Sequence, residues 1–134
     1  MRCVRFAGGL ALALVACGGD GNGGTDPEFD ITGTFIGEYT ASLTPGEVYQ
    51  ETLQLAQNGS DITGTLVTTN GRTGTVSGSV SGTRLTATVE LTDICGGTSE
   101  TTADITNDGS RLVGTYEADD CLGTYTGTFD LEKQ

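Results

Sequence analysis

The sequence predicts an all-β protein whose strands close into an eight-stranded antiparallel up-and-down barrel. Three observations support this fold class. Apolar and polar residues alternate with a period of two from about Asp30 onward, as in strands with one buried face. Turn-forming residues interrupt the alternation at short, regular intervals. Between the turns, β-branched residues are abundant, threonine above all, and nothing after residue 27 has a helical pattern.

The turn signals set the bounds of the strands. Each signal is a short group containing Gly, Pro, Asn or Asp, residues that accept hairpin geometry. These groups lie at 44–46, 58–60, 70–71, 81–82, 95–97, 107–109 and 119–120. The expected strands are therefore about 30–43, 47–57, 61–69, 72–80, 83–92, 99–106, 110–118 and 123–132. Because the turns are short, we expect each strand to pair with its neighbour in the sequence, which gives a meander.

Each expected strand has one apolar face, which we assign to the interior. The inward residues are Ile31, Gly33, Phe35, Gly37, Tyr39 and Ala41, then Leu53, Leu55, Ile62, Leu66, Val76 and Val80, then Leu85, Ala87, Val89, Leu91, Ala103 and Ile105, and finally Leu112, Gly114, Tyr116, Tyr125, Gly127, Phe129 and Leu131. Inward glycines permit strong bending and make room for aromatic rings. Closure into a barrel removes exposed sheet edges. A two-sheet β-sandwich is the alternative.

The triplet Gly33-Thr34-Phe35 carries a resemblance to a known group of barrels. It stands where lipocalins have glycine, any residue and tryptophan near the start of their first strand. The pattern as a whole resembles the lipocalin and avidin group, which implies a lipocalin-like architecture. The chain departs from the group at the aromatic position and has no tryptophan, so the resemblance implies no biotin pocket and no particular ligand.

The first 16 residues have the organisation of a secretory signal peptide. Arg2 and Arg5 give a positive start, and an apolar run from Phe6 to Val15 follows. That run is too short to span a bilayer, which needs about 20 helical residues. We divide the chain into a signal peptide at 1–16, a glycine-rich tether at 17–27 and the barrel domain at 28–134.

The end of the signal peptide, Leu14-Val15-Ala16-Cys17, resembles the lipobox of bacterial lipoproteins. The resemblance implies that the Cys17 thiol receives a lipid, that cleavage occurs just before it, and that palmitate-type acyl chains anchor the protein to a membrane of the cell envelope. More than one acyl chain gives stable anchoring. Gly18 rather than aspartate follows the cysteine, and by resemblance to enterobacterial sorting this favours the outer over the inner membrane.

Charge excludes one class of partner. After loss of Arg2 and Arg5, four basic side chains remain against 18 acidic ones, a formal charge of −14. Nucleic-acid binding requires a basic patch, which this chain lacks. Scattered acids favour a soluble, self-repelling surface, and we expect a monomer.

The cysteines and the absence of histidine restrict the chemistry. Cys3 leaves with the signal peptide and Cys17 is expected to carry lipid, so Cys95 and Cys121 form an even pair that predicts a disulfide in an exported protein. Without histidine no Ser-His or Cys-His pair exists, and two cysteines alone make a poor zinc site. The carboxylates of Asp104, Asp108 and the Asp119-Asp120 pair are expected to be solvated. We therefore expect no enzyme, no cofactor and no metal.

Two functions stay open at this point. The first is a structural or surface-interaction lipoprotein whose barrel is filled by inward side chains such as Phe35, Leu55 and Leu85. The alternative is a binding protein for a small apolar ligand or a peptide at the barrel mouth. In a meander the turns alternate between two ends, and the tyrosines are expected inside the end far from the membrane, where they would form the binding rim. These tyrosines are Tyr39, Tyr49, Tyr116 and Tyr125.

Overall fold

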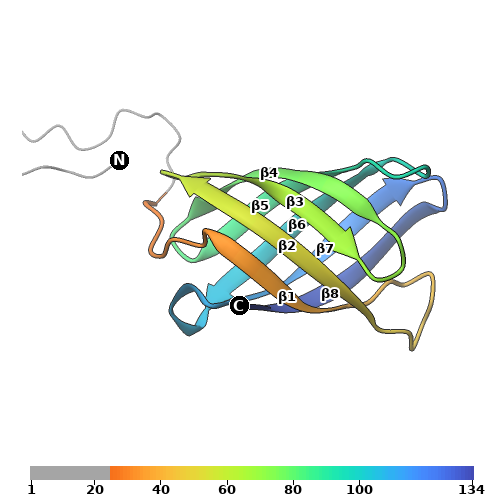
Figure 1. Cartoon of the computed structure of the whole chain (residues 1–134), viewed down its shortest axis with the longest axis horizontal. Coiled ribbons are helices and arrows are strands. Elements are labelled where there is room, and N and C mark those ends of the chain that lie inside the picture. The colour runs from red at the N-terminus through yellow and green to blue at the C-terminus, as the bar shows by residue number, and fades with distance from the viewer. Residues whose placement is uncertain (1–24) are drawn as a thin grey trace, which may run out of the picture.

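The computed structural model describes residues 25–134, which form a closed barrel of eight antiparallel strands in sequence order (Figure 1). Strands β1 and β8 close it, with Phe35 opposite Lys133 and Tyr39 opposite Phe129. The predicted meander barrel is confirmed and the β-sandwich alternative is wrong. The strands are β1 (Gly33–Tyr39), β2 (Tyr49–Asn58), β3 (Asp61–Thr68), β4 (Thr73–Ser81), β5 (Arg84–Leu91), β6 (Thr98–Thr106), β7 (Arg111–Asp120) and β8 (Gly123–Lys133).

The expected bounds of the strands hold to within two residues, except in β1. That strand is shorter than the predicted 30–43 because it loses its partners at both ends. Before Gly33, the Ile31 N–H donates to the Gln57 side chain instead of to a strand ladder. After Tyr39 the pairing with β2 stops, although Thr40 N–H still donates to Thr128 O on β8. Sequence analysis also missed a single 3-10 turn, η1 (Asn107–Gly109), at the hairpin between β6 and β7.

The predicted inward face forms the core. Phe35, Leu112 and Leu131 have no exposed surface, and Ile31 is equally enclosed. The strict period of two along every strand explains this, because a barrel has one inner and one outer face. Most of the other inward positions named from the sequence are buried as well: Tyr39, Leu53, Leu55, Ile62, Leu66, Val76, Val80, Leu85, Ala87, Val89, Ala103, Ile105 and Phe129. Four non-glycine positions are only partly buried: Ala41, Leu91, Tyr116 and Tyr125.

Two inward glycines make room for aromatic rings, as the sequence predicts. Gly127 on β8 lies opposite Tyr116 on β7, and a Cβ there would come within 2.5 Å of the tyrosine ring. Gly114 on β7 lies opposite Phe129 on β8, and a Cβ there would come within 2.8 Å of Cζ of the phenylalanine. The rings therefore lie over glycine backbone, which places both aromatic side chains inside the barrel.

The barrel has two different ends. At one end, on the left in Figure 1, the C-terminus and the short turns between β2 and β3, β4 and β5, and β6 and β7 lie together with Phe29, which packs on the core. We call this the closed end. The other end carries the connections 40–48, 69–72, 92–97 and 121–122, and we call it the open end.

Parts of the predicted organisation lie outside the described residues. These are the signal peptide at 1–16, the lipidation site at Cys17 and the tether up to residue 24. Between residues 25 and 134 the chain forms no helix with the length and hydropathy needed to cross a membrane.

Candidate functional site

A cavity of about 300 Å³ occupies the half of the barrel that faces the open end. Its wall is mostly apolar, and it extends from Leu43 and Leu122 in the loops down to Leu55 and Leu85. Other inward side chains do not line the cavity and are almost completely enclosed, and they pack the rest of the interior: Phe35, Ile62 and Leu112. The cavity is therefore a pocket with one mouth and a packed floor.

The expectation of a filled barrel is correct for the closed half and wrong for the open half. The reason is the size of the inward side chains. Ala87 on β5, Ser99 on β6 and Ala118 on β7 point into the upper interior, where leucine or phenylalanine would be needed to fill it. Eight strands enclose a space that side chains only just fill, so small residues on three consecutive strands leave it hollow.

The four predicted tyrosines lie together in this cavity at the open end. The ring of Tyr39 lies 5.3 Å from that of Tyr49 and 6.4 Å from that of Tyr116, measured between centroids. Tyr116 and Tyr125 are 6.3 Å apart, edge to face. These are the separations at which aromatic rings attract one another. The prediction that all four tyrosines face inward at one end is confirmed, and their role in binding stays a prediction.

Three of the tyrosine hydroxyl groups donate hydrogen bonds to residues in or next to the connections of the open end. Tyr39 donates to Asn70 Oδ1 at 2.6 Å, and Tyr116 donates to Thr40 O at 2.6 Å. Tyr49 donates to Thr44 Oγ1 at 3.0 Å. The rings therefore present apolar faces to the cavity while the hydroxyls are used at the rim. Burial raises the pKa of Tyr39 and of Tyr116, so both phenols are neutral near pH 7.

The fourth tyrosine belongs to an ion network that joins three loops. The guanidinium of Arg72 donates from Nε to Asp93 at 2.8 Å and from Nη1 to Asp120 at 2.9 Å. Nη2 also reaches the carbonyl oxygen of Gly96 at 3.4 Å. Tyr125 donates to the same carboxylate of Asp120 at 2.6 Å. Arg72, in the β3–β4 connection, is thus bonded both to the β5–β6 connection and to the end of β7.

The network holds Arg72, Asp93 and Asp120 in their charged forms and Tyr125 in its neutral form. Burial opposes the charge on Asp120, but hydrogen bonds from Tyr125, the Leu122 N–H and Arg72 outweigh it and keep the Asp120 pKa below its usual range. Burial likewise opposes the charge on Asp93, where hydrogen bonds from Arg72 and from backbone N–H groups again keep the pKa low. For Arg72, burial is outweighed by these two carboxylates, which raise its pKa. Burial and the Asp120 hydrogen bond raise the pKa of Tyr125 to about 12.

The expectation that Asp120 is a solvated turn residue is therefore wrong. Its side chain has no exposed surface and is bonded by Arg72 from the β3–β4 connection and by Tyr125 from the neighbouring strand β8. Local sequence does not indicate this contact, since Arg72 is 48 residues away along the chain. Asp104, by contrast, is exposed, as expected, and pairs with Arg84 on the outer surface.

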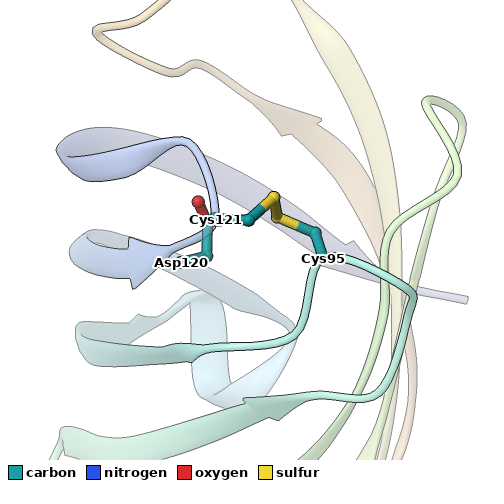
Figure 2. Close-up of side chains that lie close together, drawn as sticks. All are labelled: Cys95, Asp120 and Cys121. Atoms are coloured by element: carbon teal, nitrogen blue, oxygen red, sulfur yellow. A yellow bond between two sulfur atoms is a disulfide. The ribbon is translucent and has the colours of Figure 1, made fainter.

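A disulfide joins Cys95 to Cys121 beside this network, as predicted (Figure 2). The two Cα atoms are 5.2 Å apart, because both residues lie in connections at the open end. In the chain-entropy model a cross-link over such a loop contributes about 3 kcal/mol. Figure 2 also shows Asp120 next to the two sulfur atoms. Sulfur atoms bonded to each other are not thiolate ligands, so this cluster of donors is a cross-link and carries no metal chemistry.

Glu51 is a charged residue of the cavity wall that was not predicted from the sequence pattern. It is half-buried, and the surface that it retains belongs to the cavity wall. It lies on the inward phase of β2, between Tyr49 and Leu53, so the period of two would have found it. Burial raises the pKa of its carboxyl to about 7. Among residues 25–134 the carboxyl has no hydrogen-bond or ion-pair partner.

Chemically, the cavity is equipped for binding. A carboxyl with a pKa near 7 is suited to acid–base work, but catalysis also needs a second group near the reacting atoms. The hydroxyls of all four tyrosines donate to other groups, and Arg72 is occupied by Asp93 and Asp120. The wall presents mostly apolar surface, aromatic faces, the hydroxyls of residues such as Ser99 and Thr101, and the carboxyl of Glu51.

Comparisons with known proteins name no family. No family model matches the chain, and no curated protein matches it. Among solved structures, it is similar to a zebrafish ileal bile acid-binding protein crystallised with cholic acid. The two share 19% sequence identity and superpose with a TM-score of 0.41, over 77% of this chain and 98% of that one.

Proposed function

We propose that this chain is a lipid-anchored binding protein whose barrel takes up a small apolar molecule through the open end. The cavity carries the proposal. Its volume of about 300 Å³ lies at the lower end of the range of small-molecule sites, and its wall is mostly apolar with a few polar groups. A hollow of this kind costs stability, because its lining residues lose packing contacts. A purely structural module would gain by filling it.

The mouth of the cavity supports the same proposal. Seven large apolar side chains are exposed among the described residues, and four of them stand on the loops of the open end. Exposed apolar residues that gather around a cavity are typical of a surface that an apolar molecule crosses. The four are Leu43, Val48, Ile94 and Leu122.

The route of the chain supports an anchor on the opposite side. Thr25 N–H donates to Ser81 Oγ, and Glu28 N–H donates to Gly82 O, both at the closed end. A tether that leads from Cys17 to this point enters the barrel at the end away from the mouth. An anchored protein would then present its open end to the surroundings of the membrane. The Gly18 after Cys17 favours an outer membrane, where the envelope has one.

The lipid anchor has a direct test. Cells that express the protein are grown with labelled palmitate, and we expect the native protein to take up label because Cys17 receives acyl chains. Replacing Cys17→Ser should abolish labelling. Cys3→Ser is the matched control, since Cys3 lies in the same segment and should leave labelling unchanged. A native protein that takes up no label would end the anchor proposal.

The binding function is tested by filling the cavity. The full chain carrying Cys17→Ser is titrated with the neutral fluorescent dye N-phenylnaphthylamine, and we expect saturable binding. Ala87→Phe places a ring inside the cavity and should weaken binding at least tenfold. Thr86→Phe puts the same ring on the outer face of β5 and should not change it.

The circular dichroism melt of each variant separates loss of fold from loss of binding. If Ala87→Phe does not fold, Ser99→Leu is used as the filled variant instead, because leucine fills the cavity from β6 with a smaller side chain. Absence of saturable dye binding to the native protein, or equal binding by the filled and control variants, would contradict the proposal. Either result would favour the structural or surface-interaction role instead.

A further inference from the structure

Among the residues that the structure describes, two charged side chains line the cavity, and they are not equivalent. Arg72 is bonded to Asp93 and Asp120, so its charge is more than compensated within the protein. Glu51 has no hydrogen-bond or ion-pair partner among the described residues, and it lies on a mostly apolar cavity wall, beside Thr68 on β3. An incoming ligand therefore finds no free positive charge, and it finds one carboxylate that lacks a counter-charge.

This arrangement selects among amphiphiles by the sign of their charge. A carboxylate ligand would have to leave water for a cavity in which the one unpaired charge from residues 25–134 is also negative, and charges without partners are costly to bury. A protonated amine, by contrast, would form a charge-assisted hydrogen bond with Glu51 and supply the missing counter-charge. The formal charge of −14 on the chain after signal removal adds long-range attraction for cations.

We propose that the cavity binds a cationic amphiphile, an apolar body bearing an amine, and that Glu51 is the residue that recognises the amine. This inference rests on the proposed binding function and adds the class of ligand. The size of the cavity limits the apolar part. Its volume corresponds to about ten water molecules at about 30 Å³ each, which suits a single short alkyl chain or a small ring system.

The titration of Glu51 gives the proposal a signature in pH. Burial raises the Glu51 pKa to about 7, so the carboxyl ionises between about pH 6 and 8. The titratable groups around it are Tyr39 on β1, Tyr49 on β2, Tyr116 on β7 and Arg72 in the connection just before β4. The raised pKa values of Tyr39, Tyr116 and Arg72 keep these three groups from titrating in that interval. Amine binding should therefore tighten as the pH rises through 7.

The experiment compares three probes that share one alkyl chain: decylamine, decanol and decanoate. Each displaces N-phenylnaphthylamine from the full chain carrying Cys17→Ser, at concentrations below micelle formation. At about pH 8 we expect decylamine to bind at least tenfold more tightly than decanoate, with decanol between them. The preference for decylamine over decanoate should shrink on acidification to about pH 6.

Two variants show whether Glu51 is responsible. Glu51→Gln should remove most of the amine preference and its pH dependence. Glu38→Gln is the matched control. Glu38 is exposed on β1, so this substitution removes the same formal charge from the outer surface and leaves the cavity unchanged. An equal loss in both variants would overturn the role of Glu51 and leave only general attraction by the acidic surface.

The remaining outcomes separate this inference from the function beneath it. If decanoate and decanol bind as tightly as decylamine, the inference fails while the binding function stands. If the dye and all three probes fail to bind the native protein, the binding function itself fails.

Discussion

Replacing Arg72→Met is expected to lower the free energy of unfolding by about 3–5 kcal/mol, the range for breaking a buried ion pair from one side. The variant keeps most of the side-chain volume but leaves the carboxylates of Asp93 and Asp120 without their cation. Asp120 has no exposed side-chain surface and Asp93 is 13% exposed, so water cannot replace the lost charge without opening the loops. Urea denaturation followed by circular dichroism measures the change.

Arg84→Met is the matched control. Arg84 pairs with Asp104 on the outer surface, where both side chains are more than half exposed. Exposed pairs contribute about 0–1 kcal/mol, so this variant should unfold almost like the native protein. Similar losses in Arg72→Met and Arg84→Met would show that the network at the open end contributes no more than a surface pair does.

Replacing Glu51→Gln is expected to stabilise the protein above pH 7 and to remove a loss of stability that occurs as the pH rises. The native state binds the Glu51 proton more tightly than the unfolded chain does, because burial raises the pKa from its usual 4.5 to about 7. Stability therefore falls between these two pH values and stays low above them. One pKa unit corresponds to about 1.4 kcal/mol, which sets an upper limit of about 3 kcal/mol on the effect.

Urea denaturation at about pH 5 and about pH 8 measures this difference. The native protein should lose stability between the two, and Glu51→Gln should lose less. Glu38→Gln again serves as the control, since repulsion among exposed acids acts on both variants equally. The depressed pKa values of Asp93 and Asp120 act in the opposite direction and only at acid pH, where stability falls as these carboxylates gain protons. An identical pH dependence in all three proteins would contradict the burial of the Glu51 charge.

Much of the fold is encoded in local pattern. The period of two assigns Leu85, Val89 and Phe129 to the interior, and the structure buries them. Glycine at 114 and 127 indicates where an aromatic ring from the neighbouring strand crosses the backbone. The alternation of turns between two ends places Cys95 near Cys121, because a meander fixes which connections share an end. Each of these inferences needs only the periodicity within a strand or the order of strands and turns along the chain.

The site is different, because it depends on distances across the barrel. Whether the interior is filled is decided by the summed volume of side chains from all eight strands, and the small residues Ala87, Ser99 and Ala118 coincide only in three dimensions. Glu51 falls on the inward phase of its own strand, but its lack of a partner depends on what the other strands bring near it.

By itself, the sequence determined the eight strands, their inward faces, the end at which the tyrosines gather and the disulfide. These follow from strand periodicity and from the short turns of a meander, which are local properties. The tertiary structure decided three further properties: the hollow upper half, the buried contacts of Asp120 with Arg72 and Tyr125, and the unpaired carboxyl of Glu51. The physical reason is that packing volume and charge compensation are sums over neighbours in space, which no stretch of sequence contains.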